Sequence, residues 1–566
     1  MKAFGNAIKI ALFLLAAALV FMGTTAFAAA DSLDFWVTLP SISTAYEDGL
    51  GEIRLWARGS ARYLFLPSIA NPDDLRVHTT LPEGLTLGGV SLQSGDATGI
   101  LQPGTSVELT LGKRTYTVQI MQSSKLPTMW IATQNQSLDK IHASQNRREP
   151  ADMLLLDTEG ETVYRGELTE IKGRGNATFY FPKKPYQIKL RDGTNLLGMG
   201  KAKTWILLAE YNDYSLMRNK ITFDLAEHAG MDFVSQANWI DLYIDGDYKG
   251  TYLLSEKVHI NEDRIDIVDM EAETEELNPE PLDTYKRKGP TSAAKGGTAR
   301  GFLLPENPRD ISGGYLLELE LPARYPGDPS GFVTKAGQPV VIKSPEYASM
   351  EQVEYIRKFM QGYENAIRAK DGIDPETGKH FSEWVDLDSL VNKYLIEEIA
   401  KNVDANKTSQ FYYKPADTES TVAFAGPVWD YDGAYGNFAR SYNPRFASPQ
   451  YLSAGIDEAE SYYWWPKLYR HEAFYEPMTR IYHEVFAPAL RKITGVEENP
   501  DIFLSTLDEY EALLTDSAAM NRIRWPHFKR STHSVDTGIS LAENVVFLRN
   551  FLVRRTEFLD TTWAVE

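Results

Sequence analysis

The sequence predicts an α+β protein in which a β-rich N-terminal module precedes a larger domain of strands and helices. Three observations support this fold class. Short apolar runs alternate with polar residues before residue 124, strand-like and helix-like segments alternate after it, and the pattern from Tyr462 onward is mostly helical. The chain has 566 residues, which is enough for two or more domains.

The first 30 residues have the layout of a secretory signal peptide. Lys2 and Lys9 form a basic head, residues 10–22 are apolar and uncharged, and small residues follow at 26–30. The apolar run is short for a spanning helix, although an uncleaved membrane anchor is the alternative. No later stretch is apolar for the ~18 residues that a spanning helix needs. We therefore expect a secreted or extracytoplasmic protein, either free or associated with the cell surface.

Composition and motifs exclude several classes of function. There is no cysteine, which rules out thiol nucleophiles and cysteine-ligated zinc. The nine histidines show no His-x-x-x-His or His-Glu-x-x-His spacing, and no Gly-x-Ser-x-Gly elbow occurs, so zinc and serine hydrolases are disfavoured. Asp and Glu outnumber Lys and Arg by 78 to 58. Because such a chain repels phosphate backbones, general nucleic-acid binding is not expected.

The region from 31 to 124 is expected to form a small β-sandwich of the immunoglobulin-like kind. Residues 107–111 and 116–120 both alternate apolar with polar side chains, and Gly112 with Lys113 can turn the chain between them. Further turn candidates at 71–74 and 81–84 separate short apolar runs. Such a module is typical of a spacer or of an adhesive unit.

The larger domain is expected to span residues 125–566. Strand-like segments occur at 186–190, 240–244 and 315–319. Helical periodicity predicts helices at 215–228 and 388–402. The segment 271–308 begins acidic, becomes basic and ends rich in Gly and Ala, so we expect a mobile insertion there.

A first candidate site lies in residues 172–178 (KGRGNAT) and 183–189 (KKPYQIK). Gly173 and Gly175 allow the backbone to approach a ligand closely, and Arg174 adds a fixed cationic fork. Lys189 ends a strand-like segment just after this turn, an arrangement by which kinases hold the phosphates of ATP. The alternative is an ordinary tight β-turn followed by a solvated basic face.

A second candidate site consists of aspartates. Asp404 follows the helix predicted at 388–402, and Asp430 and Asp432 follow an apolar strand predicted at 422–428. Two carboxylates directed at one point suit Mg²⁺, and Asp404 could accept a proton from an attacking hydroxyl. The alternative is that Asp430 and Asp432 cap turns and pair with arginines such as Arg440.

Taken in order, these segments resemble the CotH kinase family, named for a spore-coat kinase. The resemblance extends from about Leu126 to the C-terminal helices and excludes the β-rich module. It is carried by residues 172–178 with 184–189, 212–220 (NDYSLMRNK), 242–257 (LYIDGDYKGTYLLSEK), 313–318 (GGYLLE), 402–404 (NVD) and 429–432 (WDYD).

The resemblance implies an atypical protein-kinase-like fold of two lobes, with ATP between them and Mg²⁺ or Mn²⁺ as the metal. It assigns Asp404 as the catalytic aspartate, Asp430 as a metal ligand and Asp432 as a second one. The phosphates would be held by Lys189 and by the turn of Gly173, Arg174, Gly175 and Asn176, and Glu256 would lie near the interlobe hinge.

The chain departs from typical kinases at several of these positions. It has neither His-Arg-Asp nor Asp-Phe-Gly. Ser409 stands where a typical kinase has its metal-binding asparagine, and Asn406 is the candidate substitute. Asp224 and Glu227 are the candidate acidic partners of Lys189.

The sequence thus predicts a secreted or surface-associated phosphotransferase that passes the γ-phosphate of ATP to hydroxyl side chains of an extracytoplasmic protein, with cell-surface or coat components as further partners. One alternative is a catalytically inactive, kinase-like structural or adhesive surface protein. Another is a glycosidase, in which Asp404 and Asp430 or Asp432 would flank a sugar at ~5–9.5 Å.

Overall fold

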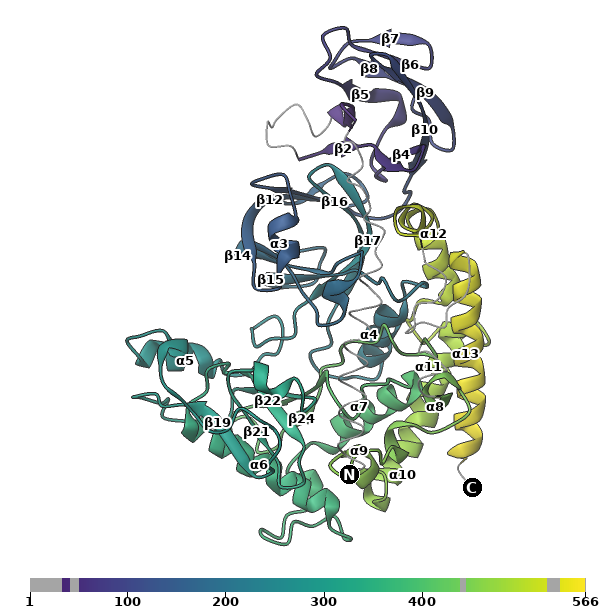
Figure 1. Ribbon diagram of the computed structural model, residues 1–566. Helices are drawn as coiled ribbons and strands as arrows, with labels where there is room; N and C mark the ends of the chain where they lie inside the picture. Colours follow the sequence, from purple (N-terminus) through teal and green to yellow (C-terminus); the bar gives the residue numbers. More distant parts are fainter. Residues whose placement is uncertain (1–32, 41–49, 438–443, 527–539, 565–566) are drawn as a thin grey trace, which may run out of the picture. The chain divides into compact units, whose positions relative to one another are not determined.

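The computed structural model describes residues 33–40, 50–437, 444–526 and 540–564 (Figure 1). The signal peptide predicted for residues 1–30 and the side chain of Arg440 lie outside these ranges. None of the described helices is long and apolar enough to cross a membrane. The chain divides into two compact units, Met1–Gln122 with Gly246–Tyr248, and Ser123–Asp245 with Lys249–Glu566.

The N-terminal unit consists of two β-sheets. A four-stranded sheet has the order β2-β1-β5-β8, and a six-stranded sheet has the order β3-β4-β10-β9-β6-β7. The hairpin predicted around residue 112 is confirmed, since β9 and β10 pair antiparallel with Leu111 opposite Arg114. Alternate side chains of β9 are buried because the strand presents one face to the core. The strands are β1 (Trp36–Thr38), β2 (Glu52–Arg54), β3 (Trp56–Arg58), β4 (Ala61–Leu66), β5 (Leu75–His78), β6 (Leu85–Leu87), β7 (Val90–Leu92), β8 (Ala97–Thr98), β9 (Ser106–Leu111) and β10 (Arg114–Gln122).

The larger unit begins with a closed barrel of seven strands in the order β11-β12-β13-β14-β15-β17-β16. Its interior is filled by apolar side chains that alternate along each strand, among them Ile131, Ile188 and Trp205. The barrel strands are β11 (Thr128–Thr133), β12 (Arg148–Leu156), β13 (Thr162–Gly173), β14 (Tyr186–Asn195), β15 (Lys201–Leu208), β16 (Ala237–Ile244) and β17 (Asp247–Glu256). A short helix, α3 (Asp139–Ala143), precedes β12, and α4 (Arg218–His228) connects β15 to β16.

A second sheet of seven strands follows the barrel, in the order β18-β19-β21-β22-β20-β23-β24. Helix α6 (Met350–Arg368) packs against its β19 and β21, and α7 (Leu387–Ala400) packs against β24. The strands are β18 (Arg287–Lys288), β19 (Thr298–Phe302), β20 (Tyr315–Leu319), β21 (Gly331–Val333), β22 (Pro339–Ser344), β23 (Gln410–Lys414) and β24 (Phe424–Ala425).

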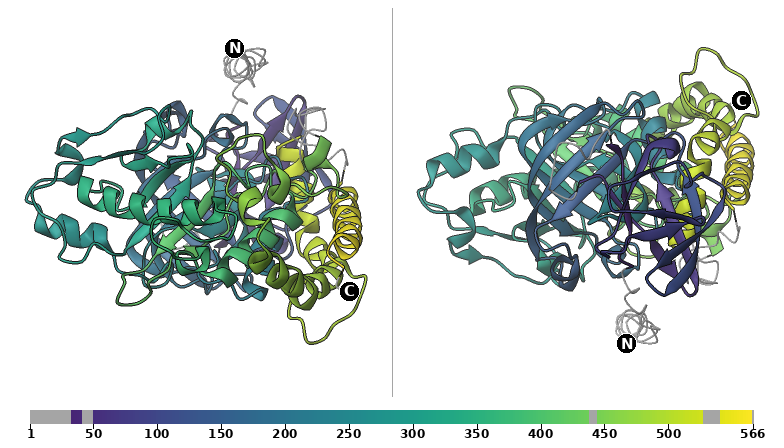
Figure 2. Two further views of the ribbon diagram at one scale, coloured as in Figure 1. Left: turned by 90° about the horizontal axis from the view of Figure 1, so that it is seen from below. Right: turned by 90° about the horizontal axis from the view of Figure 1, so that it is seen from above.

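The C-terminal part of this unit is helical, as predicted. Figures 1 and 2 show its helices at one edge of the unit, with α5 (Met270–Leu277) and the second sheet towards the opposite edge. A large apolar core runs through the helices and the second sheet. The C-terminal helices are α8 (Pro444–Ala447), α9 (Trp465–Leu468), α10 (Glu472–Ile481), a π-helical turn (Tyr482–Phe486), α11 (Ala487–Thr494), α12 (Leu507–Arg524) and α13 (Leu541–Thr562).

The predicted mobile insertion at 271–308 is wrong. The segment contains α5, β18 and β19, because its polar side chains find partners inside the fold. Thr274 on α5 is fully buried and accepts a hydrogen bond from Gln352 at 3.0 Å. Arg300 on β19 is also fully buried and donates to the backbone oxygens of Tyr325 and Asp328 at 2.7 and 2.6 Å. Composition alone misjudged a segment whose charges are satisfied by tertiary contacts.

Most other elements match their predictions with shifted ends. The helix predicted at 215–228 begins at Arg218, and that predicted at 388–402 is α7. The strand predicted at 422–428 is much shorter, because β24 covers Phe424–Ala425 only. Pro427 lacks an N–H for the ladder, so the chain leaves the sheet before Asp430.

Candidate active site

Asp404 lies on the turn that follows α7. Lys401 ends the helix in the left-handed conformation (φ 51°), which directs the chain into this turn. The Asp404 N–H donates to Asn402 Oδ1 at 3.0 Å, and its carbonyl accepts from the Lys407 N–H at 2.8 Å. The pKa of Asp404 is raised to about 6, chiefly by burial and then by the charge of Asp430. The backbone of Asp404 is therefore fixed in the turn, and burial shifts the pKa of its carboxyl group towards neutrality.

Asp430 follows the short strand β24 and faces solvent. Its backbone is in the left-handed region (φ 73°), which is unfavourable for a residue with a side chain and is typical of functional sites. Ser409 Oγ donates to Asp430 Oδ2 at 3.2 Å, and the Ser409 N–H donates to Glu318 Oε1 at 3.1 Å. Ser409, which stands where a typical kinase has asparagine, thus links Asp430 to the second sheet.

Asp432 completes a cluster of three aspartates. The pKa of Asp432 is raised to about 8, chiefly by burial and then by the charges of Asp430, Asp213 and Asp404. Because Asp404 and Asp432 each respond to Asp430, the three carboxylates lie within electrostatic reach of one another. The sequence prediction that these three residues converge is supported by this mutual repulsion, which a cation would relieve.

The Gly-rich turn brings a cation to this cluster. The Arg174 N–H donates to Pro185 O at 3.1 Å and closes the loop between β13 and β14. The Arg174 guanidinium carbon lies 5.6 Å from the centre of the Trp429 ring. Burial lowers the pKa of Arg174, while the charges of Asp430 and Glu318 oppose that shift. Arg174 therefore lies within electrostatic reach of Asp430 and Glu318.

The two glycines of the turn are required for different reasons. A Cβ on Gly173 would lie 2.5 Å from Phe179 Cε2, so this position needs a residue without a side chain. Gly175 has φ +84°, which favours glycine, and its carbonyl accepts a hydrogen bond from Gln145. Asn176 is exposed at the tip of the turn. The structure records no contact of Asn176 with the aspartates among the described residues.

Lys189 does not reach the cluster. It is exposed on the outer face of β14, because its neighbours Ile188 and Leu190 point into the barrel and strand side chains alternate. The structure therefore gives no support to its role as the phosphate lysine. The proposed partner Asp224 is occupied by Lys220 and Tyr510, and Glu227 lines a separate cavity.

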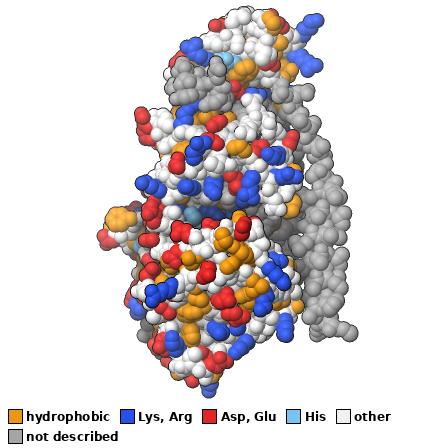
Figure 3. Space-filling model, turned by 90° about the vertical axis from the view of Figure 1, so that its left-hand side faces the viewer, with side chains coloured by type: hydrophobic (Ala, Val, Ile, Leu, Met, Phe, Trp, Pro, Cys, Tyr) orange, Lys and Arg blue, Asp and Glu red, His pale blue; other side chains and the backbone are white. Residues whose placement is uncertain are grey.

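Several cations from other segments gather around Lys257. Burial lowers the pKa of Lys257, and the charges of Lys172, Lys343 and Arg174 lower it further, so these four cations lie near one another. Lys343 pairs with Glu318 at 3.6 Å. Lys257 directly follows Glu256 in the sequence. Its local pattern is that of an ordinary surface lysine, so the sequence did not identify it as a site residue. Figure 3 shows a furrow across this side of the molecule, with Lys and Arg gathered above it and Asp and Glu below it.

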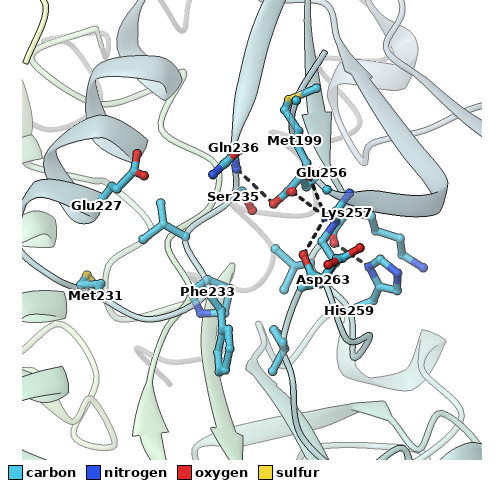
Figure 4. A pocket seen from close by; sticks show the side chains of 17 residues that line it. Met199, Glu227, Met231, Phe233, Ser235, Gln236, Glu256, Lys257, His259 and Asp263 are labelled. Atoms are coloured by element: carbon cyan, nitrogen blue, oxygen red, sulfur yellow. Dashed lines mark hydrogen bonds and ion pairs between the residues drawn. The ribbon is translucent and has the colours of Figure 1, made fainter. Parts of the chain in front are cut away.

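Glu256 lies at the end of β17, where the chain leaves the barrel. It pairs with Arg264 at 2.7 Å and accepts from the Gln236 N–H at 3.1 Å. Burial raises its pKa to about 7, and Arg264 opposes that shift. Glu256 lines a cavity of about 330 Å³ together with Met231, Phe233, Lys257 and other residues (Figure 4). The structure places Glu256 at the last residue of β17, and its location near an interlobe hinge stays a prediction.

The donor set fits a Mg²⁺ or Mn²⁺ ion shared with a phosphate. Among the described residues, no group of three or more His, Cys, Asp or Glu side chains is arranged as a complete metal site. Mg²⁺, however, is usually held by one or two carboxylates plus substrate phosphates. Asp430 and Asp432 would provide those carboxylates. Asn406 Nδ2 donates to Ala454 O at 3.0 Å, while its buried Oδ1 has no partner within the described part of the chain and remains a candidate ligand.

Comparison with known proteins identifies the family. The sequence profile described as CotH kinase protein matches residues 171–559, which is well over half of the chain. No curated protein matches significantly. Among solved structures, a candidate glycoside hydrolase from Bacteroides thetaiotaomicron is 15% identical over 31% of this chain and 51% of that chain, about half its length. Its TM-score of 0.11 is too low to inform the fold or the function. On the strength of the profile match, this chain belongs to the CotH kinase family.

Proposed function

We propose that this protein is an ATP-dependent phosphotransferase that phosphorylates hydroxyl side chains of an extracytoplasmic protein. The observation that carries the proposal is the convergence of Asp404, Asp430 and Asp432 beside Arg174 of the Gly-rich turn. In this proposal the barrel with α4 is the nucleotide-binding lobe of a kinase-like fold, and the second sheet with the C-terminal helices is the other lobe.

Asp404 is the proposed general base. An acceptor hydroxyl attacks the γ-phosphorus, its proton passes to an Asp404 carboxylate oxygen, and the bond between the γ-phosphorus and the β,γ-bridging oxygen breaks to release ADP. A carboxylate with a pKa of about 6 is mostly ionised at neutral pH and is still basic enough to share that proton. The turn contacts to Asn402 and Lys407 hold the backbone of Asp404 in place.

Asp430 and Asp432 are the proposed ligands of Mg²⁺ or Mn²⁺, with Asn406 as a further candidate. When bound, the ion supplies charge neutralisation at the phosphates. Ser409 holds the Asp430 carboxylate by its 3.2 Å hydrogen bond. The elevated pKa of Asp432 supports a cation site, because buried like charges are costly unless a cation is present.

The nucleotide is proposed to lie between Arg174 and the segment that follows Glu256. Arg174, Lys172, Lys257 and Lys343 bring four positive charges to the phosphates of ATP. The cavity of about 330 Å³ shares Lys257 with this group and has apolar walls that include Phe233 and Pro427, which suits a purine base. The turn around Gly173 can approach the phosphates closely.

The protein is proposed to act outside the cytosol, free or at the cell surface, on protein acceptors that include surface or coat components. This part of the proposal rests on the leader-like N-terminus and on the acidic composition, which disfavours nucleic acid as a partner.

The proposal is tested on the chain from Asp31 onward, incubated with γ-labelled ATP, Mg²⁺ or Mn²⁺ and protein acceptors. Asp430→Ala and Asp404→Asn should each abolish transfer, whereas Lys189→Ala, a cation of the same barrel hairpin, should not. If the parent binds no nucleotide and transfers no phosphate to itself or to any acceptor, the alternative of a kinase-like structural or adhesive protein is favoured. Metal-independent glycan cleavage that is lost in Asp430→Ala would indicate the glycosidase alternative.

A further inference from the structure

One buried asparagine connects α4 to the turn that carries the aspartates. Asn219 is the second residue of α4 and is 4% exposed. Its Oδ1 accepts the N–H of Tyr431 at 2.7 Å, and its Nδ2 donates to Glu210 Oε1 at 2.9 Å. A single carboxamide therefore holds the residue between Asp430 and Asp432 and, at the same time, a carboxylate at the end of β15.

Tyr431 is held at its other end by α7. Its side chain is fully buried, and its hydroxyl donates to Glu397 Oε1 at 2.5 Å. Lys393, one turn earlier on α7, pairs with the same oxygen at 2.8 Å. The backbone of Tyr431 is thus fixed by α4 and its side chain by α7, so the turn has little freedom to rotate.

This turn needs such restraint because its backbone is strained. Asp430, immediately before Tyr431, has φ 73°, and Glu210 has φ 49°. Residues with side chains keep such conformations only where surrounding contacts over-determine them. Asn219 contacts both strained segments. It accepts from the Tyr431 N–H, next to Asp430, and donates to the Glu210 carboxylate.

Glu210 shows that Asn219 also acts on the charge of the site. Burial raises the pKa of Glu210 well above its usual range, and the charges of Asp213 and Asp432 raise it further, while the hydrogen bond from Asn219 lowers it. The second oxygen, Oε2, is buried without a partner among the described residues. Asn219 therefore fixes the orientation of a carboxylate that lies within electrostatic reach of Asp432.

We infer that Asn219 is a positioning residue that sets the divalent-cation affinity of Asp430 and Asp432 by holding the Tyr431 N–H, and that it thereby couples α4 to the cation site. The inference rests on the cation site of the proposed function. Residues that orient metal ligands without touching the metal typically change metal affinity by about 10- to 100-fold when replaced.

The test is direct Mn²⁺ binding to the chain from Asp31 onward, measured by electron paramagnetic resonance without nucleotide or turnover. Asn219→Leu, which removes both hydrogen bonds at similar volume, should raise the Kd for Mn²⁺ about 10- to 100-fold. Asn392→Leu is the matched control. Asn392 on α7 donates to Ala229 O at 3.1 Å, next to the other end of α4, and its loss should change the Kd by less than about twofold, since it does not touch Tyr431.

A conservative variant separates the two bonds of Asn219. Asn219→Asp keeps an oxygen for the Tyr431 N–H but places a second carboxyl group beside Glu210, so it is combined with Glu210→Gln, which restores the total charge. This double variant should bind Mn²⁺ within about threefold of the parent. In turnover, Asn219→Leu should recover most of the parental kcat at saturating Mn²⁺, a pattern that a general loss of folding would not give. If Asn219→Leu does not fold, Asn219→Ser, whose side chain is shorter, carries the same expectation.

Each outcome has a defined meaning. A parent that binds no Mn²⁺ overturns the cation site and this inference together. A parent that binds Mn²⁺ beside an Asn219→Leu variant of equal affinity overturns the inference alone. Equal losses in Asn219→Leu and in the double variant Asn219→Asp with Glu210→Gln refute the role of the Tyr431 N–H.

Discussion

Replacing Asp404 with asparagine should abolish phosphate transfer and yet make the protein more stable above neutral pH. Burial and Asp430 raise the pKa of Asp404 from 3.8 to about 6 in the folded protein. A carboxyl group whose pKa is raised by folding favours the folded state when protonated, and that contribution is lost as the pH rises through the folded pKa. At pH 8 the ionised Asp404 therefore destabilises the fold, and the neutral amide of Asp404→Asn does not.

The size of the effect follows from the difference between the two pKa values. At 1.36 kcal/mol per pKa unit, the difference between 3.8 and about 6 corresponds to about 3 kcal/mol at most. The full difference applies above about pH 7, and it vanishes below about pH 3, where Asp404 is protonated in both states. Loss of a general base should lower kcat by about 10²- to 10⁴-fold.

The assay is denaturant unfolding of the parent and Asp404→Asn at pH 4.5 and pH 8, in EDTA so that no divalent ion contributes. We expect the variant to exceed the parent in free energy of unfolding at pH 8 and to approach it at pH 4.5. Asp501→Asn, an exposed aspartate, controls for the loss of a charge. A variant that is less stable than the parent at pH 8, or a difference that does not depend on pH, would refute the reasoning.

Three further predictions concern the Gly-rich turn and the barrel. Arg174→Ala should raise the KM for ATP about 10- to 100-fold, because a charge-assisted contact is lost; an unchanged KM would remove Arg174 from the site. Lys189→Ala should leave the KM and kcat within about twofold of the parent, since this side chain is exposed; a large loss would restore the sequence-based assignment. Gly173→Ala should lower the free energy of unfolding by about 1–3 kcal/mol, because its Cβ would lie 2.5 Å from Phe179; urea unfolding without loss of stability would contradict the geometry.

Sequence reasoning succeeded where a local pattern decides the structure. The alternation of residues 107–111 predicted a hairpin of the N-terminal unit, and helical periodicity predicted α4 and α7 to within a few residues. The three aspartates that the sequence singled out lie within electrostatic reach of one another. The order of motifs along the chain indicated the family that the profile match shows.

Sequence reasoning failed where long-range packing decides. Lys189 has the spacing of a kinase lysine, but the barrel closes with Ile188 inside, and alternation then turns Lys189 outward. Lys257 and Lys343 come from segments far apart in the sequence, and only the tertiary fold brings them near Arg174. The segment 271–308 has a disordered composition, but buried partners for Thr274 and Arg300 order it.

The roles of Asn219 and Glu210 could not have been read from the sequence. Asn219 lies inside a helix, where asparagine is usually a neutral surface residue, and its two hydrogen bonds reach residues 9 and 212 positions away. Glu210 carries no motif of its own. Its place beside Asp432 depends on the strained backbone at the end of β15.

The central claim is that Asp430 belongs to a cation-dependent phosphotransferase site. The most direct measurement is transfer of ³²P from γ-labelled ATP by the chain from Asp31 onward, with and without Mn²⁺, beside its Asp430→Ala variant. The account predicts transfer that requires the metal and is lost in Asp430→Ala, while both proteins unfold at similar temperatures. Transfer that persists in Asp430→Ala, or a folded parent that neither binds ATP with Mn²⁺ nor transfers phosphate, would contradict it.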